Sequence, residues 1–211
     1  MVYICAYRDW ALEIYNQVKN EIDCELIEGK DKFDYTKFNK NDIIFFIGWS
    51  WIINDNLIKN NKCICLHPSP LPKYRGGSPI QHQIINGESL SAVTFFEMTD
   101  KLDAGVILYK EYFSLKGDLK DIFLRISNLG VSGILRILHS NIIKETQDES
   151  KATFYKRRKP KESEILIDDF IKYTAKELHN KIRSLQDPYP NAYIQCKDGS
   201  KLYITKTKNN D

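Results

Sequence analysis

Short apolar runs separated by helical patterns constrain the fold of this chain most strongly. Val2–Ala6 (VYICA), Ile43–Gly48 (IIFFIG) and Lys62–His67 (KCICLH) read as buried strands, and Cys24–Glu28 reads as a weaker one. Ile43–Gly48 is apolar on both faces, which is typical of a central strand in a parallel sheet. Strands that alternate with helices predict an α/β fold of the doubly wound class, with a mostly parallel sheet.

Helix signals occupy several of the segments between and after these strands. Asp9 is expected to cap a helix, because apolar residues recur after it at helical spacing. Pro79 suits the first position of a helix that continues to Ile85. Leu119–Ser140 is predicted to be a long amphipathic helix, and Thr174–Gln186 a helix that ends at the sequence DPYP.

Four further strand candidates complete the predicted architecture. Ala92–Met98 and Val106–Leu115 extend the sheet, and Ala192–Cys196 pairs with Lys201–Thr205 in a predicted hairpin. The length of 211 residues fits one α/β domain with a short C-terminal helix and β-hairpin.

The composition argues against several classes of protein. A net charge of +3 gives no reason to expect a nucleic-acid or membrane partner, and the basic run Tyr155–Glu162 is predicted to be a solvated linker. The cysteines number five, an odd count, and most lie in apolar runs, so we expect reduced thiols and a cytoplasmic protein. The first residues do not resemble a signal peptide.

The segment that begins at His67 is the strongest candidate for a functional site. Ligands of doubly wound sheets bind beyond the carboxyl ends of the strands, and His67 lies at such an end. Prolines at alternate positions of the sequence HPSPLP restrict the backbone that follows. Asp103 stands in a second turn, LDAG. Because side chains alternate along a strand, Cys63, Cys65 and His67 are predicted to point to one side.

Three interpretations of these residues compete. His67 and Asp103 could simply stabilise a loop and a turn, which is the best explanation for an isolated residue of either type. A metal site would use Cys63, Cys65, His67 and Asp103, but a Cys-x-Cys pair on a regular strand holds its sulfurs too far apart for one tetrahedral ion, so no metal is expected. Acid–base chemistry by His67 and Asp103 accounts better for a loop of fixed shape.

The chain reads CLHPSPLP over residues 65–72 and LDAG over residues 102–105. These motifs resemble the hallmark of the 10-formyltetrahydrofolate-dependent formyltransferases, which is Asn-x-His-Pro/Ala-Ser-x-Leu-Pro followed by Asp-x-Gly. The similarity extends to DIIFFIGWSWII, KYRGGSPIQ, VTFFEM and IRSLQDPYPNAYI, and so covers most of the chain. It implies the fold of a formyltransferase catalytic domain over residues 1–150. A linker, helix and hairpin over residues 151–211 would pack on the same domain.

The resemblance also implies roles for individual residues. His67 would assist the attack of an amine on the formyl carbonyl of 10-formyltetrahydrofolate, the co-substrate, and stabilise the developing negative charge. Asp103 would tune His67 and handle the amine proton through a bound water. The implied folate-binding residues are Trp51, Ile52, Ile53, Met98, Thr99, Asp100, Leu102 and Asp103. The implied acceptor-binding residues are Tyr7, Arg8, Lys73, Tyr74 and Arg75, with Gln81 expected to steady the loop.

Cys65 departs from the family pattern, which has a catalytic asparagine two residues before the histidine. An amide donates a hydrogen bond to the formyl oxygen, whereas a thiol is a weak donor. Loss of one such donor costs about 3 kcal/mol of transition-state stabilisation. Another donor could substitute, the mechanism could be slower or altered, or the protein could bind folate without transfer. A thiol that carries the formyl group is a further hypothesis.

The acceptor is expected to be a small molecule. The first strand is followed by CAYRDWA rather than by the Gly-Ser-Asn phosphate loop of the purine enzyme, and the tail after the basic run is short compared with the tRNA-binding barrel of the methionyl-tRNA enzyme. We therefore expect the amine of a nucleotide-linked amino sugar as acceptor, with no nucleic acid and no membrane as partner. A homodimer is compatible with the sequence. A folate-binding module without catalysis and a hydrolase that releases formate are the alternatives.

Overall fold

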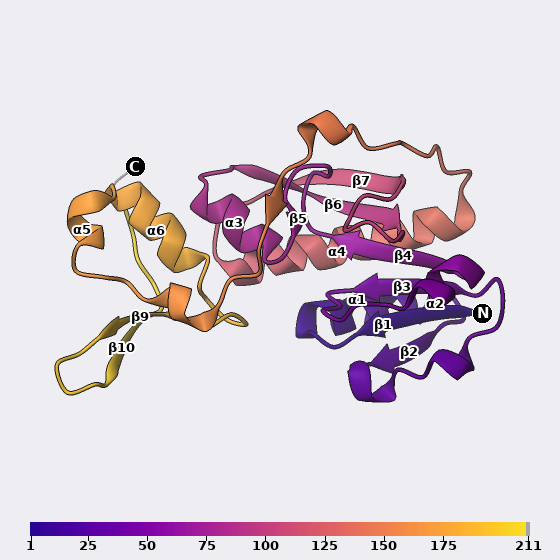
Figure 1. The fold of residues 1–211 in the computed structure, drawn as a ribbon, viewed down its shortest axis with the longest axis horizontal. Helices are drawn as coiled ribbons and strands as arrows, with labels where there is room; N and C mark the ends of the chain where they lie inside the picture. The colour runs from indigo at the N-terminus through magenta and orange to yellow at the C-terminus, as the bar shows by residue number, and fades with distance from the viewer. Residues whose placement is uncertain (210–211) are drawn as a thin grey trace.

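The structure, a computed structural model, describes residues 1–209 and is built around a six-stranded sheet (Figure 1). The strand order is β2-β1-β3-β4-β6-β7. In chain order the helices and strands are β1 (Val2–Ala6), α1 (Asp9–Val18), β2 (Glu25–Glu28), β3 (Ile43–Ile47), α2 (Asp55–Asn60), β4 (Lys62–His67), β5 (Arg75–Gly76), α3 (Pro79–Ile85), β6 (Leu90–Glu97), β7 (Ile107–Ser114), α4 (Leu119–His139), β8 (Phe154–Tyr155), α5 (Asp169–Lys172), α6 (Ala175–Arg183), β9 (Ala192–Gln195) and β10 (Lys201–Ile204). Short 3₁₀ turns occur at Lys30–Lys32, Tyr35–Lys37, Glu149–Lys151 and Pro160–Ser163.

The sheet is mixed but mostly parallel, which confirms the predicted fold class. Strands β2, β1, β3 and β4 run parallel, whereas β6 and β7 are antiparallel to their neighbours. The β9–β10 hairpin forms as predicted. The predicted appendage over residues 151–211 includes residues 210 and 211, which lie outside the described residues.

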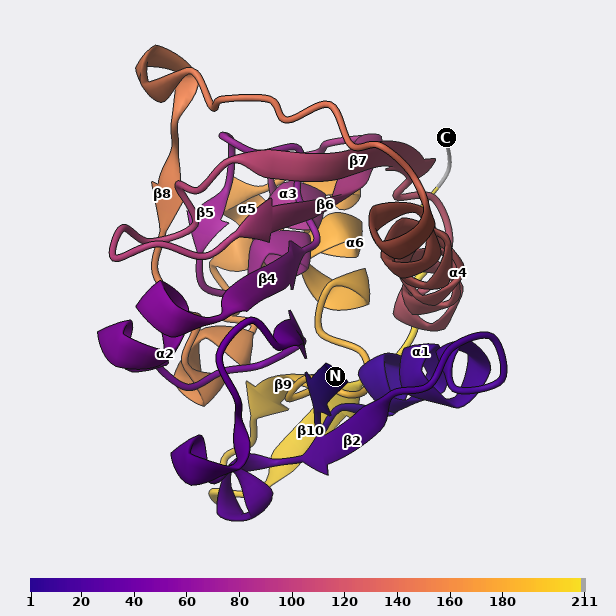
Figure 2. The same cartoon turned by 90° about the vertical axis from the view of Figure 1, so that its right-hand side faces the viewer.

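Helices cover both faces of the sheet. Figure 2 shows α1 and α4 on one side and α2 on the other. The larger core lies under α1 and α4, where Phe45 and Leu66 of the sheet meet Ile14 and Ile126 of the helices. The smaller core lies on the opposite face, with Cys5, Phe46 and Cys63. This second face is the one to which Cys65 and His67 also belong, because strand residues two apart share a face.

Helix α4 is a buried core helix. Its length and hydropathy would suit a membrane span, and it is the one helix in residues 1–209 of which this is true. However, Leu119, Ile126 and Ile134 are fully buried against the protein core. The apolar character of α4 is therefore explained by packing on the sheet and on α1.

Two local predictions need correction. Asp9 is the first helical residue of α1 rather than its cap, because the chain is still extended at Arg8 and turns helical one residue later. The basic run is exposed along most of its length, as predicted, but its main chain is bound to the body of the protein. The N–H of Gly77 donates to the carbonyl of Tyr155 at 2.9 Å, and the N–H of Arg158 donates to Ser78 Oγ at 3.2 Å. These contacts hold the run against the segment that follows His67.

The C-terminal part is joined to the sheet body by hydrogen bonds between side chains and main chain. Gln81 Nε2 in α3 donates to the carbonyl of Ser184 at 3.3 Å. Arg183 Nη1 donates to the carbonyl of Leu115 at 2.8 Å, and the N–H of Leu119 donates to Gln186 Oε1 at 3.0 Å. In Figure 1 this part, with α5, α6 and the hairpin, extends from the end of the sheet at which β4 stops.

Candidate active site

His67 ends β4 and is held by one strong hydrogen bond. Its side chain is almost fully buried, and Nε2 lies 2.8 Å from the carbonyl oxygen of Tyr74. A carbonyl can only accept, so Nε2 donates this hydrogen bond, and whenever the ring is neutral the lone pair is on Nδ1. Nδ1 lies 3.7 Å from Asp103 Oδ2. The atom of His67 that can take a proton therefore faces a carboxylate.

Asp103 is fixed in an unusual backbone conformation. Its φ is +49°, in the left-handed region that L-residues rarely adopt. The N–H of Gly76 donates to Asp103 Oδ2 at 2.8 Å, which holds the carboxylate in place beside His67. Tyr74 and Ser78 also have positive φ values, so three of the four non-glycine residues of this kind in the described chain lie in or beside this site. Such strain persists only where surrounding contacts enforce it.

The HPSPLP loop is braced from several directions. Gln83 Nε2 donates to the carbonyl of Pro68 at 2.9 Å, and Thr94 Oγ1 donates to the carbonyl of Ser69 at 2.6 Å. Ser69 Oγ in turn donates to the carbonyl of Lys73 at 2.8 Å. The expectation that Gln81 steadies this loop is wrong. Gln81 bonds to the C-terminal part, and Gln83, two residues further along α3, braces the loop.

Cys65 lies on the same face of β4 as His67 and packs against the apolar cluster of Leu71, Phe96 and Ile107. Burial raises the pKa of the Cys65 thiol well above its ordinary value, and the nearby Asp103 carboxylate raises it further. The thiol is therefore protonated at neutral pH. Within residues 1–209 there is also no group of three or more His, Cys, Asp or Glu side chains able to hold a metal ion. At Cys65 the arrangement offers an uncharged S–H rather than a thiolate.

The matching family model is that of the formyl transferases, and it covers residues 28–138, which include His67, Asp103 and Cys65. The chain belongs to the formyl transferase family. Methionyl-tRNA formyltransferase of Ligilactobacillus salivarius is 31% identical over 207 residues, which is 94% of this chain and 61% of that protein. The enzyme of the same name from Natranaerobius thermophilus is 35% identical over 70% of this chain and 47% of its own length. The chain thus spans about half to three fifths of these curated relatives.

Solved structures of the formyl transferase family share the fold over nearly the whole chain. A methionyl-tRNA formyltransferase from Clostridium thermocellum is 27% identical with a TM-score of 0.82, and the match covers 96% of each chain. A 4-N formyltransferase from Francisella tularensis is 18% identical with a TM-score of 0.79, over 99% of this chain and 98% of that one. The second likeness is one of fold alone.

The residues expected at the pterin side of a formyl transferase site lie in two loops. After β3, the ring centre of Trp51 lies 4.7 Å from that of Tyr7, with the two rings tilted at 51°. Ile53 is buried in the smaller core, and Ile52 points to solvent with 96% of its surface exposed. Trp51, Ile52 and Ile53 are consecutive and were expected to share one role, but in the structure their side chains point to different surroundings. After β6, Met98 packs beside Cys65.

Most main-chain N–H groups of the loop from Thr99 to Asp103 have no partner among the described residues. Among the described residues, only the N–H of Lys101 in this loop donates a hydrogen bond, to Thr99 Oγ1 at 3.2 Å. Thr99, Asp100 and Leu102 are exposed. Free N–H groups beside apolar side chains suit the polar edge and flat face of a heterocycle.

Tyr7 and Arg8 lie together at the carboxyl end of β1. Tyr7 Oη is 2.6 Å from Ser50 Oγ, and the guanidinium of Arg8 lies 4.9 Å from the Tyr7 ring centre. Within the described chain Arg8 has no acidic partner; it donates to the carbonyl of Gly48 and to Ser50 Oγ.

The side chain of Arg75 is not available to bind an acceptor. Arg75 is buried, and its guanidinium is bound by Gln147 Oε1 at 2.8 Å and by Glu149 Oε1 at 2.6 Å. The prediction that it binds an acceptor is wrong, because it already has partners inside the protein. Lys73 and Tyr74 instead border a separate cavity of about 430 Å³ behind the HPSPLP loop.

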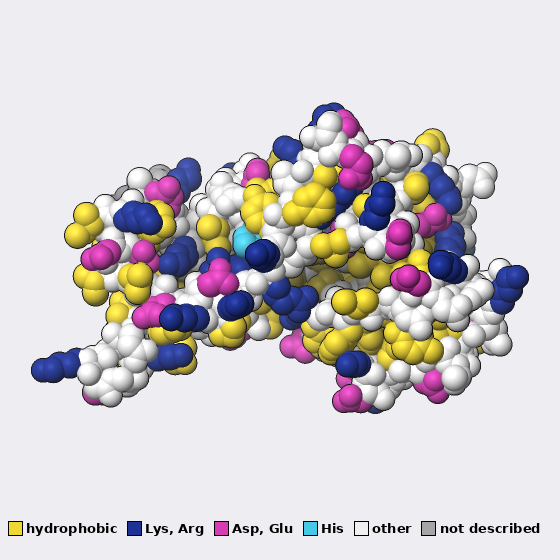
Figure 3. Space-filling model, in the orientation of Figure 1, with side chains coloured by type: hydrophobic (Ala, Val, Ile, Leu, Met, Phe, Trp, Pro, Cys, Tyr) yellow, Lys and Arg dark blue, Asp and Glu magenta, His cyan; other side chains and the backbone are white. Residues whose placement is uncertain are grey.

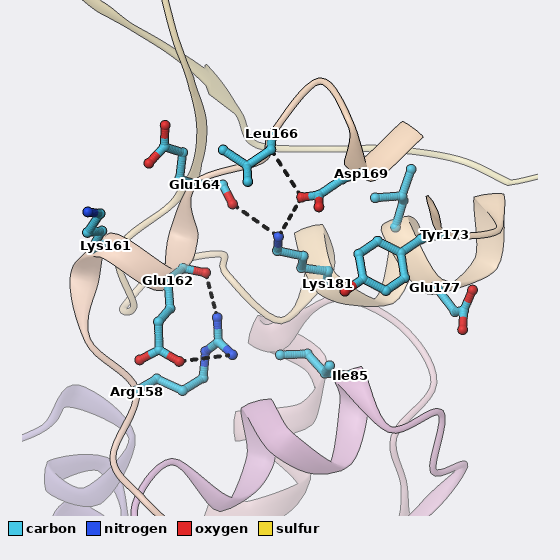
Figure 4. Close-up of a pocket in the computed structure, with 11 residues that line it drawn as sticks. Ile85, Arg158, Lys161, Glu162, Glu164, Leu166, Asp169, Tyr173, Glu177 and Lys181 are labelled. Atoms are coloured by element: carbon cyan, nitrogen blue, oxygen red, sulfur yellow. Dashed lines mark hydrogen bonds and ion pairs between the residues drawn. The ribbon is translucent and has the colours of Figure 1, made fainter. Parts of the chain in front are cut away.

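The surface of this side of the molecule is hollowed between the part with β6 and β7 and the part with β1 and β2, and hydrophobic side chains line the hollow (Figure 3). A cavity of about 690 Å³ lies elsewhere, between α3 and the C-terminal part. Figure 4 shows its ion pairs, Lys181 with Asp169 and Arg158 with Glu162. Neither His67 nor Asp103 lines this cavity, so its size is no guide to the chemistry.

Several residues that shape the site carry no signal in the sequence. The N–H of Gly76 binds Asp103, and Gln147 Nε2 donates to the carbonyls of Asp103 and Gly105 at 2.9 and 2.8 Å. Gln147 lies in an irregular segment, far from Asp103 along the chain, and no local periodicity marks it. Nothing in the sequence of the basic run predicts that residues 153–158 lie alongside the loop after His67 and bond to it.

Proposed function

We propose that this chain transfers a formyl group from 10-formyltetrahydrofolate to a primary amine, and that the amine belongs to a nucleotide-linked amino sugar. One observation carries the proposal: Nδ1 of His67 faces the Asp103 carboxylate at 3.7 Å, at the end of β4 in a member of the formyl transferase family. A histidine with a neighbouring carboxylate is suited to general acid–base work near neutral pH.

The reaction is an acyl transfer in which an amine attacks the formyl carbonyl and its oxygen gains negative charge. Nδ1 of His67 takes the proton that the attacking nitrogen loses, because Nε2 is already bound to Tyr74. The resulting imidazolium is stabilised by the Asp103 carboxylate. The proton then returns to the nitrogen that leaves the formyl group. Burial of His67 excludes most of the water that would screen these charges.

Cys65 occupies the position of the family's catalytic asparagine in this proposal. Its raised pKa keeps it an S–H, so it offers the developing oxyanion a weak hydrogen bond and no competing negative charge. We propose that a main-chain N–H of the Thr99–Asp103 loop supplies a second donor, since these groups have few partners in the protein.

The folate fits the apolar side of this site. Cys65, Leu71, Phe96, Ile107 and Met98 form one apolar cluster beside His67, and the free N–H groups of residues 99–103 stand at its edge. A pterin ring offers a flat face and a polar edge, which match these two features. Trp51 and Ile53 would support the ring from the β3 side.

An amino sugar linked to a nucleotide suits the opposite side. Arg8, which lacks an acidic partner among the described residues, lies with Tyr7 at the end of β1 and can bind a phosphate. Among the matching structures, one from Mycobacterium tuberculosis is described as a likely sugar N-formyltransferase and matches all of this chain at 15% identity. Such an acceptor is consistent with the modest net charge of +3.

Methionyl-tRNA is the second candidate acceptor. The observation that favours it is that relatives at 31% and 35% identity bear the name methionyl-tRNA formyltransferase. We propose a catalytic domain over residues 1–150 and an appendage that begins at residue 151, whichever acceptor is used. The proposed location in the cytoplasm also applies to either acceptor.

The test is an assay of 10-formyltetrahydrofolate consumption by absorbance, with a panel of nucleotide-linked amino sugars, methionyl-tRNA and water alone. Turnover that requires an amino sugar supports the proposal. Turnover only with methionyl-tRNA keeps the reaction and replaces the acceptor. Turnover with water alone identifies a hydrolase, and folate binding without turnover under every condition identifies a binding module. Either of the last two results overturns formyl transfer.

A further inference from the structure

Gln147 connects the two sides of the candidate active site through one side-chain amide. It is almost fully buried. Nε2 donates to the carbonyls of Asp103 and Gly105, and Oε1 accepts from Arg75 Nε at 3.2 Å and Arg75 Nη2 at 2.8 Å. These four bonds use both donors and both acceptor sites of the amide. The chain therefore commits the whole side chain to this junction.

The bonds from Nε2 hold the backbone on both sides of Ala104. Asp103 has a φ of +49°, a conformation that is unfavourable for an L-residue. The carbonyls of Asp103 and Gly105 both point to Gln147, which favours this turn over a relaxed one. If the turn relaxed, the direction of the Asp103 side chain would change with its backbone.

The bonds to Oε1 fix the opposite side of the site. Arg75 lies between Tyr74, whose carbonyl accepts the hydrogen of His67 Nε2, and Gly76, whose N–H binds Asp103 Oδ2. Gln147 and Glu149 hold the Arg75 guanidinium. A displacement of Arg75 would therefore move the main-chain groups that position both His67 and Asp103.

We infer that Gln147 is a positioning residue that sets the geometry between Asp103 and His67, by fixing the left-handed turn at Asp103 and the main chain around Arg75. The inference rests on the proposed function, because it assigns the purpose of this geometry to proton transfer. Gln147 acts through Asp103 and does not itself touch a reacting atom. It differs from Glu149, which binds Arg75 alone.

The test compares Gln147→Glu with Asp148→Asn, a change at the exposed neighbour whose side chain bonds to Ser150 and Lys151 rather than to Arg75 or Asp103. The first change keeps the size of the side chain and an oxygen for Arg75, but replaces the donor to two carbonyls by a carboxylate oxygen that repels them. We expect kcat to fall by about 10²-fold with KM for 10-formyltetrahydrofolate nearly unchanged, as for a small misplacement of a reacting group. Asp148→Asn, the matched control, should keep kcat within about twofold of the parent. Gln147→Met, which removes the polar contacts without adding charge, replaces Gln147→Glu if that variant does not fold.

A double variant distinguishes positioning of Asp103 by Gln147 from a purely structural role of Gln147. In an Asp103→Asn background, Gln147→Glu should cause little further loss of kcat, because its effect passes through Asp103. A further loss equal to that of the single variant would overturn the inference, and so would kcat within about twofold of the parent in the single variant.

A readout independent of turnover separates this inference from the proposed function. The amide proton of Gly76 reports the position of the Asp103 carboxylate, to which it is bonded. In Gln147→Glu we expect this amide to shift in the NMR spectrum and to exchange faster with solvent, while Asp148→Asn leaves it unchanged. An unchanged Gly76 amide in Gln147→Glu overturns the inference even if the parent protein is active. A parent without turnover overturns the proposed function, and the Gly76 amide still reports whether Gln147 holds Asp103.

Discussion

Nδ1 of His67 and Oδ2 of Asp103 stand 3.7 Å apart, close enough for strong attraction between ions but too far for a direct hydrogen bond. The carboxylate is held by the N–H of Gly76 and the ring by the carbonyl of Tyr74, so neither partner needs the other to stay in place. The pair is therefore oriented before any substrate binds. Its attraction becomes strong only when His67 takes a proton, as the proposed reaction requires.

Substitution of either member of this pair should abolish transfer without unfolding the protein. We expect His67→Asn and Asp103→Asn each to lower kcat by about 10²- to 10⁴-fold, the range for loss of a general acid–base group. Thermal unfolding should shift by only a few degrees, because both replacements retain polar side chains of similar size. Activity retained in either variant would remove that residue from the proposed mechanism.

Cys65→Asn should raise the rate of formyl transfer. An amide in this position donates a stronger hydrogen bond to the oxyanion than the protonated thiol does, and one such donor is worth about 10²-fold in kcat. Steady-state kinetics with Cys65→Ala as the baseline measures the gain. A fall in kcat below that of the parent would show that the thiol itself, or its packing against Leu71 and Phe96, is required.

The Cys65 thiol should not titrate in the range in which the enzyme works. Burial raises its pKa well above the ordinary value, and burial likewise raises the pKa of Cys63 to about 12. An acid with a raised pKa keeps its proton until the pH approaches that higher value. The thiols of Cys65 and Cys63 should therefore resist iodoacetamide at about pH 8 in the folded protein. Mass spectrometry of labelled native and unfolded protein measures this. Rapid labelling of native Cys65 would contradict its assignment as an uncharged donor.

The ion pair in the C-terminal part should stabilise the protein in a pH-dependent way. Burial is the largest influence on the pKa of Asp169 and raises it, but the bonds from Lys181 and the N–H of Leu166 together outweigh burial and lower the pKa below 3.8. A lowered pKa means stabilisation that is present above 3.8 and is lost as the pH falls through the folded value.

We therefore expect Asp169→Asn to lower the free energy of unfolding by about 1 kcal/mol near neutral pH, a modest value because Lys181 is partly exposed. The difference from the parent should vanish in acid, below the lowered pKa. Urea titrations across this range measure it, with exposed Asp168→Asn as the control. An equal loss at every pH would show that the ionic interaction is not the cause.

Gly105→Ala should be strongly destabilising. A Cβ at this position would lie 1.6 Å from the carbonyl oxygen of Glu97, which is main chain and cannot rotate away. We expect a loss of about 4 kcal/mol or more. Gly87→Ala is the control: its φ is +79° with no atom within 4 Å of the new carbon, so only about 1–2 kcal/mol of backbone strain is expected. Similar losses in the two variants would contradict the close approach of Gly105 to β6.

Local patterns in the sequence were sufficient for much of the fold. Three predicted elements formed as expected: strand β3 from its run that is apolar on both faces, helix α4 from its apolar face, and helix α3 from Pro79 at its start. Each of these signals acts within a single element. Strand alternation also placed Cys63, Cys65 and His67 on one face correctly, because the period of two is a property of the single strand.

Tertiary contacts decided the rest, because they join residues that no local pattern links. Arg75 looked like a surface ligand residue in the sequence, yet Gln147 and Glu149, which lie far along the chain, bury its charge. The loop after His67 takes its shape from residues 153–158 and from Gln83. The positive φ of Asp103 likewise depends on Gln147 and Gly76. The sequence alone predicted which residues would carry the chemistry of this face. Only the folded chain decided their distances, since these depend on hydrogen bonds between distant segments.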